Sequence, residues 1–455
     1  MFLEKREKNA LTGYLTLNGF SLDCVKELKY LGVVLDRLNK VARNSFGIKS
    51  NVSSLIYKQG IVPFICYGSQ IWGSALKKKI YCRLLRKIQR RIVLRVISGY
   101  RTISYEAVFA ISGFPPIDIF IIRNNEFKIA TKNCTNKCLD GSLRVSELPH
   151  PSERFPLNLV NYRKNIENNF PVVCFTDGSK INTKVGLAFV IFQDFIEIGT
   201  RQFRISDECS VFQAELLCIA QAVSWICNNE ILSSNFLICS DSLSSLCALN
   251  NIYSQNKLIV KTHINLNFLR SRGVQVFFSF VRGHTGIYGN ERADWLAKEA
   301  TKLRDLVPMS IPKSYHKKVF KEKIISEWNN LYQISINAHL TKEFFPSIQS
   351  RLKAKHFHPN FKLTQFLTGH GNFKAYLKHF NLSLTDQCSC SSDTIQNAKH
   401  LILACTNFSS ERCTLMKCLQ KNNIEWPPPL SAFVDGNSSF TFFCAFINSI
   451  FPCIN

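Results

Sequence analysis

Four acidic residues stand where apolar strand patterns end and helical patterns begin. Asp177 follows the apolar run VVCFT, and Asp241 follows the run FLICS. Glu215 lies near the start of the helical pattern SVFQAELLCIAQAVSWICNN, and Asp294 lies in the first turn expected for ADWLAKEA. An open α/β sheet places its ligand site beside the strand termini, so we expect these four side chains to meet there.

Such a set of carboxylates predicts a metal site. Four carboxylates brought together cannot all stay ionised without a counter-charge, and oxygen-binding divalent cations supply one. Two Mg²⁺ ions a few ångströms apart can then bracket a scissile phosphate, with Mn²⁺ as a substitute. Each acid taken alone is typical of a turn or a helix N-cap, so the prediction rests on the set.

The elements that must position these acids lie in residues 171–302. Apolar periodicity predicts the order β-β-β-α-β-α-α-β-α, with the first three strands forming an antiparallel meander. We therefore expect an α/β domain with a mixed five-stranded sheet flanked by helices. The last strand, VQVFFSF, runs into the glycine-punctuated loop RGHTGIYG, which contains His284.

The motifs TDGS, QAEL, SDS and GHTGIYGNERADWLAKEA, in that order, resemble the type 1 ribonuclease H domain over about 130 residues. The resemblance implies a ribonuclease H-like fold and a two-metal site. It implies that Asp177 bridges both metals, Glu215 and Asp241 hold the metal on the leaving-group side, and Asp294 holds the metal that activates water. His284 matches a mobile-loop histidine that assists proton transfer or product release.

The charge of the chain predicts an anionic partner. Lys and Arg number 57 against 32 Asp and Glu, a net charge of +25, which favours nucleic acid. The stretch from Lys77 to Arg101 holds ten Lys and Arg and no acid. We expect it to be a helix that tracks phosphates, and the alternative is a solvated basic face.

Within that helix an apolar stripe at i, i+4 spacing predicts a buried face; it consists of Ile80, Leu84, Ile88, Ile92 and Val96. Arg83, Lys87 and Arg90 lie on a different face and are the expected nucleic-acid contacts. The ribonuclease H-like segment has only NNIYSQNK between its second and third helices, so the basic insertion that some members of that family use to grip hybrid is missing. The flanking regions are expected to supply the grip.

The flanks carry a second resemblance. The motifs KYLGVVLDR, YGSQIWG, RKIQRRIVLRVISGY and EAVFAISGFPPIDI resemble the thumb and connection of arthropod-type non-LTR retrotransposon reverse transcriptases. No Asp-Asp pair occurs in the chain, so the polymerase palm is missing and polymerisation is not expected. We predict a mainly helical thumb and connection remnant at 1–135, a linker at 136–170, the ribonuclease H domain at 171–302 and a basic, mainly helical region at 303–455.

The C-terminal region contains a candidate zinc site. Cys388, Cys390, His400 and Cys405 follow the pattern C-x-C-x9-H-x4-C, and three thiolates with an imidazole suit tetrahedral Zn²⁺. The pattern resembles the zinc-knuckle-like element of the same retrotransposons. The one-residue gap is tighter than usual, so reduced structural cysteines remain the alternative.

The function expected from these features is Mg²⁺-dependent endonucleolytic cleavage of RNA in RNA–DNA hybrids by part of a retrotransposon polyprotein. The alternatives are a decayed element that only binds nucleic acid, and an integrase or exonuclease, which the GNERAD motif disfavours. No apolar run reaches the ~18 residues of a membrane span, and the charged N-terminus does not resemble a signal peptide. We expect an intracellular protein, nuclear or cytoplasmic, with no membrane partner; the oligomeric state is left open.

Overall fold

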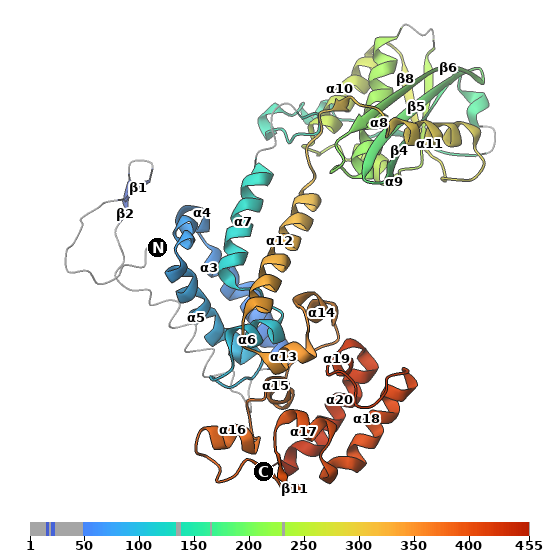
Figure 1. Ribbon diagram of the computed structural model, residues 1–455. Coiled ribbons are helices and arrows are strands. Elements are labelled where there is room, and N and C mark those ends of the chain that lie inside the picture. The colour runs from blue at the N-terminus through green and yellow to red at the C-terminus, as the bar shows by residue number, and fades with distance from the viewer. Residues whose placement is uncertain are drawn as a thin grey trace. The chain divides into compact units, whose positions relative to one another are not determined.

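The computed structural model forms two compact units (Figure 1). One unit comprises Met1–Phe127 together with Phe320–Asn455, and the other comprises Lys128–Val319. The structure describes residues 15–17, 20–22, 49–132, 138–163, 166–229 and 233–454. The motif KYLGVVLDR lies outside the described residues. Near the N-terminus, the short strands β1 (Leu15–Leu17) and β2 (Phe20–Leu22) form an antiparallel pair.

The unit of Lys128–Val319 is built on one mixed sheet whose strands lie in the order β3-β8-β7-β4-β5-β6-β9. The strands are β3 (Asn158–Asn161), β4 (Val172–Ile181), β5 (Lys184–Gln193), β6 (Ile196–Ile205), β7 (Asn235–Ser240), β8 (Gln275–Phe280) and β9 (Leu306–Val307). β4, β5 and β6 are antiparallel neighbours, whereas β7 runs parallel to β4 and β8. The predicted order of elements and the antiparallel meander are confirmed.

Helices cover both faces of this sheet because its central strands are apolar on both sides. The helices are α8 (Val211–Asn228), α9 (Leu243–Asn250), α10 (Lys257–Ser271) and α11 (Tyr288–Ala300). Val172 and Cys174 of β4 pack in the core beneath α8, α9 and α10, while Val173 and Phe175 pack in the core beneath α11. Alternation along the strand therefore places Asp177 on the same sheet face as Phe175.

The segment predicted as a linker at 136–170 is instead part of this unit. Its residues Asn158–Asn161 form β3, which pairs in parallel with β8, and Leu157 joins the core. Asp140 accepts hydrogen bonds from Gln213 Nε2 at 2.7 Å and from the backbone N–H of Ser310 at 2.8 Å. The sheet has two edge strands more than the five predicted, since β3 and β9 both come from outside 171–302.

The other unit is mainly helical, as predicted for both flanks. Before the sheet-bearing unit lie α2 (Ser50–Ile56), the π-helix η1 (Tyr57–Ile61), α3 (Val62–Cys66), α4 (Ser69–Trp72), the 3-10 helix η2 (Gly73–Lys77), α5 (Lys79–Val96), α6 (Tyr105–Ser112) and α7 (Ile117–Lys132). After it lie α12 (Lys313–Ile334), α13 (His339–Phe344), α14 (Ile348–Lys353), α15 (Phe361–Thr368), α16 (Lys374–His379), β10 (Gln387–Cys388), β11 (Ser391–Ile395), α17 (Ala398–Leu403), α18 (Ser409–Lys421), α19 (Ala432–Asp435) and α20 (Asn437–Ile450).

The two flanks share one hydrophobic core, whereas the sequence predicts two separate regions. α7 and α12 lie side by side (Figure 1), with the rings of Phe120 and Phe320 5.9 Å apart. The buried Arg351 guanidinium donates two hydrogen bonds to the carbonyl of Ile111. The chain therefore enters the sheet-bearing unit from one helix of this core and returns to the core through another.

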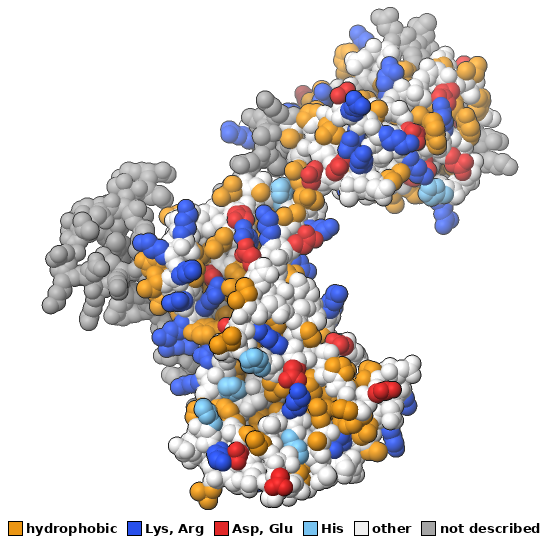
Figure 2. Space-filling model, in the orientation of Figure 1, with side chains coloured by type: hydrophobic (Ala, Val, Ile, Leu, Met, Phe, Trp, Pro, Cys, Tyr) orange, Lys and Arg blue, Asp and Glu red, His pale blue; other side chains and the backbone are white. Residues whose placement is uncertain are grey.

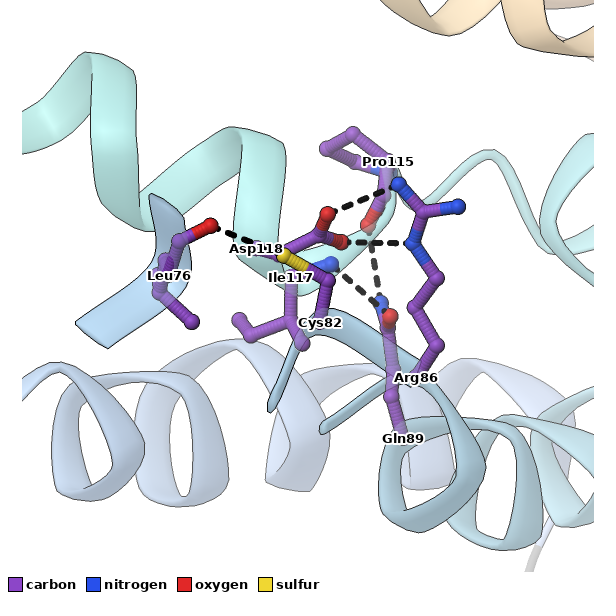
Figure 3. Close-up of polar contacts among 7 residues, drawn as sticks. All are labelled: Leu76, Cys82, Arg86, Gln89, Pro115, Ile117 and Asp118. Atoms are coloured by element: carbon purple, nitrogen blue, oxygen red, sulfur yellow. Dashed lines mark hydrogen bonds and ion pairs between the residues drawn. The ribbon is translucent and has the colours of Figure 1, made fainter. Parts of the chain in front are cut away.

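A buried polar network fixes α5 against α7 (Figure 3). The Arg86 guanidinium donates to both carboxylate oxygens of Asp118 at 2.8 and 2.7 Å. The amide of Gln89, fully buried, donates to the Pro115 carbonyl and accepts from the backbone N–H of Ile117. This bidentate pair of the half-buried Arg86 with the buried Asp118 holds orientation as well as distance, so α5 presents a defined face to solvent.

Within the described part of the chain, α8 alone has the length and hydropathy of a membrane span, and the bent pair of α6 with α7 passes the same test jointly. α8 packs against the sheet and is mostly buried.

Candidate functional site

Three of the four predicted acids meet beside the central strand β4. Asp177 lies on β4, Glu215 on α8, and Asp241 directly after β7. One oxygen from each lies within 4.8 Å of the others, and the side chains of Asp177 and Glu215 are buried. These three residues are called the three-carboxylate cluster below.

Asp177 does not stand at the end of its strand, as the sequence predicted. β4 continues to Ile181 and pairs with β5 along its whole length, so that Asp177 faces Ala188 in register. Gly178 then allows α8 to approach the strand, because a Cβ there would lie 2.8 Å from the backbone nitrogen of Glu215. The glycine of the TDGS motif is thus needed for the acid of QAEL to reach Asp177.

The fourth acid, Asp294, lies near the cluster but is paired with a lysine. α11 begins at Tyr288, so Asp294 lies in its second turn and not in the first as predicted. Gly289 lets the start of α11 pack on the Phe175 ring, since a Cβ there would meet the ring at 2.2 Å. Asp294 Oδ2 accepts from Lys298 Nζ at 2.6 Å, and Asp294 does not belong to the group within 4.8 Å.

The loop with His284 lies against the cluster through its backbone. A Cβ at Gly283 would come 2.9 Å from Asp241 Oδ2, so a larger residue there would shift the Asp241 carboxylate. His284 is exposed and has a φ of 56°, in the left-handed region. Glu291, which the sequence did not single out, anchors the loop by accepting from the Gly286 N–H at 3.1 Å.

The donor set fits a divalent cation. Glu215 Oε2 is buried and has no hydrogen-bond partner, which is costly unless a cation or water satisfies it. Burial, with the neighbouring carboxylates, raises the pKa of Asp177 to about 7 and that of Glu215 to about 9. Burial also raises the pKa of Asp241. A bound cation would relieve the repulsion and let these oxygens ionise.

These pKa values predict how the stability of the metal-free protein depends on pH. The pKa values of Asp177 and Glu215 are higher in the folded than in the unfolded chain. At pH values between the unfolded and the folded pKa, the folded state therefore binds more protons than the unfolded state. The free energy of unfolding in EDTA should therefore fall as pH rises from about 5 to about 8, by up to ~1.4 kcal/mol per pH unit for each group.

Calorimetry across this pH range, with EDTA and with excess Mg²⁺, measures the effect. Mg²⁺ should remove most of the decline, because it stabilises the ionised form. A melting temperature of the metal-free protein that rises over the same range would contradict the assignment.

The Cys/His cluster of Cys388, Cys390, His400 and Cys405 forms as the sequence predicted. Its four ligand atoms lie within 4.8 Å of one another. Cys388 Sγ and Cys405 Sγ are 3.7 Å apart, and Cys390 Sγ is 3.2 Å from His400 Nε2. Two thiolates at ~2.3 Å from a tetrahedral zinc lie about 3.8 Å apart, so the arrangement fits one zinc ion.

The basic helix differs in part from its prediction. Ile92 and Val96 of the apolar stripe are buried, but Ile80 and Leu84 are 53% and 39% exposed. Arg83 and Lys87 are exposed, together with Lys77–Lys79. Figure 2 shows Lys and Arg side chains mixed with hydrophobic ones in the region of α5.

Arg90, the third predicted contact, has structural partners. Its guanidinium donates to the carbonyls of Arg101 and Ile103 and lies 5.1 Å from the centroid of the Tyr105 ring. The side chain holds the loop after α5. Arg83 and Lys87 remain candidates for contacts with nucleic acid.

The fold and site define a ribonuclease H domain, and a family model described as RNase H matches residues 169–302. The predicted family and α/β fold are confirmed for this domain. The strand order around β4, and the acids on β4, on α8 and directly after β7, agree with that assignment.

Several similar proteins are retrotransposon polyproteins. Two are "Retrovirus-related Pol polyprotein from type-1 retrotransposable element" R1 4 and R1 3 of Nasonia vitripennis. The first is 28% identical over 127 residues, 23% of this chain and 32% of that protein. The second is 27% identical over 188 residues, 34% of this chain and 46% of that protein. The matches thus span less than half of these curated relatives.

Among solved structures, the foamy viral protease-reverse transcriptase in complex with RNA/DNA hybrid is 20% identical, with a TM-score of 0.24, over 29% of this chain and 20% of that one. LC11-RNase H1 in complex with RNA/DNA hybrid is 15% identical, with a TM-score of 0.24, over 29% of this chain and 96% of that one.

Proposed function

We propose that this chain cleaves the RNA strand of RNA–DNA hybrids endonucleolytically, as part of a retrotransposon-derived polyprotein. The observation that carries the proposal is the three-carboxylate cluster within the RNase H domain. Its buried, unpartnered Glu215 oxygen and raised pKa values are what a site for hard cations has before they bind.

A pair of Mg²⁺ ions, when bound, supplies charge compensation and an activated water at the scissile phosphate. Asp177, whose carboxylate groups with those of Glu215 and Asp241, would hold both ions. Glu215 and Asp241 would hold one ion and Asp294 the other. His284, which is exposed on its loop, would accept or release a proton beside the site.

A cleavage assay with the full chain on RNA–DNA hybrid, duplex DNA and duplex RNA tests the proposal. Cleavage of hybrid RNA alone, leaving 5′-phosphate and 3′-hydroxyl ends, is the expected result. Cleavage of duplex DNA would favour the integrase or exonuclease alternative. Binding of hybrid without cleavage at any Mg²⁺ or Mn²⁺ concentration would favour the decayed element.

We propose that α5 contributes to substrate binding through Arg83 and Lys87. Both are exposed on a helix whose basic side chains outnumber its acids, and self-repulsion there is relieved by a polyanion. Each neutralised phosphate adds nearly one unit to the slope of log affinity against log salt concentration.

The double substitution R83Q and K87Q should weaken hybrid binding and flatten this slope by roughly two units. Fluorescence anisotropy of labelled hybrid across a salt titration measures it. The matched control is K378Q with K399Q, which removes two lysines paired with Asp386 and Glu343 in the same unit. Equal slopes for the two double variants would show that α5 does not contact phosphates.

A further inference from the structure

One lysine pairs with the fourth acid, Asp294, next to the three-carboxylate cluster. Asp294 and Lys298 are one turn apart on α11, and Lys298 Nζ lies 2.6 Å from Asp294 Oδ2. The two side chains are 20% and 44% exposed respectively, so the pair is partly shielded from water. Asp294 is therefore paired with Lys298 and is not part of the three-carboxylate cluster.

The charge of Lys298 reaches further than its direct partner. Its ammonium group lowers the pKa of Asp177, against the larger effects of burial and of Asp241 and Asp294, which raise it. Among the described residues, Lys298 is thus a cationic side chain that acts on the cluster as well as on Asp294. Lys298 therefore supplies part of the counter-charge that the metal-free site needs.

An ammonium group and a divalent cation would contend for the same carboxylate. Asp294 Oδ2 pairs with Lys298 Nζ at 2.6 Å, so a cation held by either oxygen of this carboxylate would lie close to the ammonium group. The ammonium group of Lys298 and a divalent cation would repel each other at such a short distance. Binding of the second cation would therefore require Asp294 to leave Lys298.

We propose that Lys298 is a positioning residue that holds Asp294 away from the cluster and competes with the second divalent cation for it. The inference rests on the proposed two-metal function. It assigns the chain an internal counter-ion that makes the second cation bind more weakly than the first.

The test measures Mn²⁺ binding to the full chain without substrate, by calorimetry and by electron paramagnetic resonance of free Mn²⁺. Lys298→Met should tighten the weaker Mn²⁺ site about three- to tenfold, the gain expected from removing one nearby positive charge at partly exposed positions. Lys298→Arg should leave the affinity close to that of the wild type. In EDTA, Lys298→Met should melt at a lower temperature, because the carboxylates lose a counter-charge.

Two further variants distinguish this role from a general effect on α11. Lys302→Met removes the exposed ion pair of Lys302 with Glu299, one turn further along the chain, and should not change Mn²⁺ affinity. In an Asp294→Asn background, Lys298→Met should no longer tighten binding, since the contested carboxylate is gone. An unchanged or weaker Mn²⁺ site in Lys298→Met, or an equal gain in Lys302→Met, would overturn the proposal.

Failure of the inference is separable from failure of the proposed function. A wild-type chain that cleaves hybrid while Lys298→Met leaves Mn²⁺ affinity unchanged refutes only the role of Lys298. A wild-type chain that binds no Mn²⁺ refutes the two-metal function itself. If Lys298→Met does not fold, Lys298→Gln carries the same expectation, and its circular dichroism is compared with that of Lys302→Met.

Discussion

Asp177→Asn should abolish Mg²⁺-dependent cleavage of hybrid, lowering the rate by roughly a thousandfold or more, or about 4 kcal/mol in activation free energy. Asp177 is a buried member of the cluster, and a neutral amide cannot balance the charge of two cations. The same substitution should raise the melting temperature in EDTA, because it removes one of several clustered like charges.

A gain in stability with a loss of activity would separate chemistry from folding. The matched control is Asp207→Asn, which removes a carboxylate paired with Arg204 outside the cluster; it should leave the cleavage rate near that of the wild type. Single-turnover cleavage and calorimetry on both variants measure the two effects. Near-normal cleavage by Asp177→Asn would show that the site has been assigned wrongly.

The local order of elements in the RNase H domain was predictable, because each strand and helix carries its own apolar period. The extent of β4 was not. The residues TDGS look like a turn, yet pairing of Gly178–Ile181 with β5 extends the strand through them. The reversal comes only at Asn182 and Thr183, both with positive φ. Register with a partner strand decided what the local residues left open.

The long-range contacts could not be read from the sequence. β3 is four residues in a polar, proline-containing stretch, and its pairing depends on β8, more than a hundred residues away. Thr364 Oγ1 likewise donates to the carbonyl of Ile97 at 2.6 Å, although the sheet-bearing unit separates these two residues in the sequence. Nothing near Ile97 or Thr364 in the sequence marks this contact, so the flanks were divided where the structure joins them.

The partners of the charged side chains were also not predicted from the sequence alone. Arg90 looked free in a run of basic residues because its acceptors are backbone carbonyls, which composition does not reveal. Lys298 is an i+4 neighbour of Asp294, and that spacing was a signal available in ADWLAKEA. Glu291 supports the His284 loop by accepting from a backbone N–H, a contact that the sequence does not indicate.

The Cys/His cluster joins separate elements of the helical unit. Cys388 comes from β10, His400 from α17, and Cys405 from the residue before a 3-10 turn. Cys405 is fully buried, and its carbonyl accepts from the buried Arg412 at 2.7 Å. A zinc ion there would connect the β10–β11 hairpin to the helices that follow it.

We therefore expect the purified chain to hold about one zinc ion and Cys405→Ser to lose it, because a hydroxyl is a poor ligand where a thiolate is needed. Metal binding is coupled to folding at such sites, so the helical unit should become less stable and more protease-sensitive. Cys413→Ser, which changes an exposed free cysteine on α18, should keep both zinc and stability. Elemental analysis of protein prepared without chelator, with limited proteolysis of both variants, measures this. A wild-type chain free of zinc, or a Cys405→Ser chain that retains it, would favour reduced structural cysteines instead.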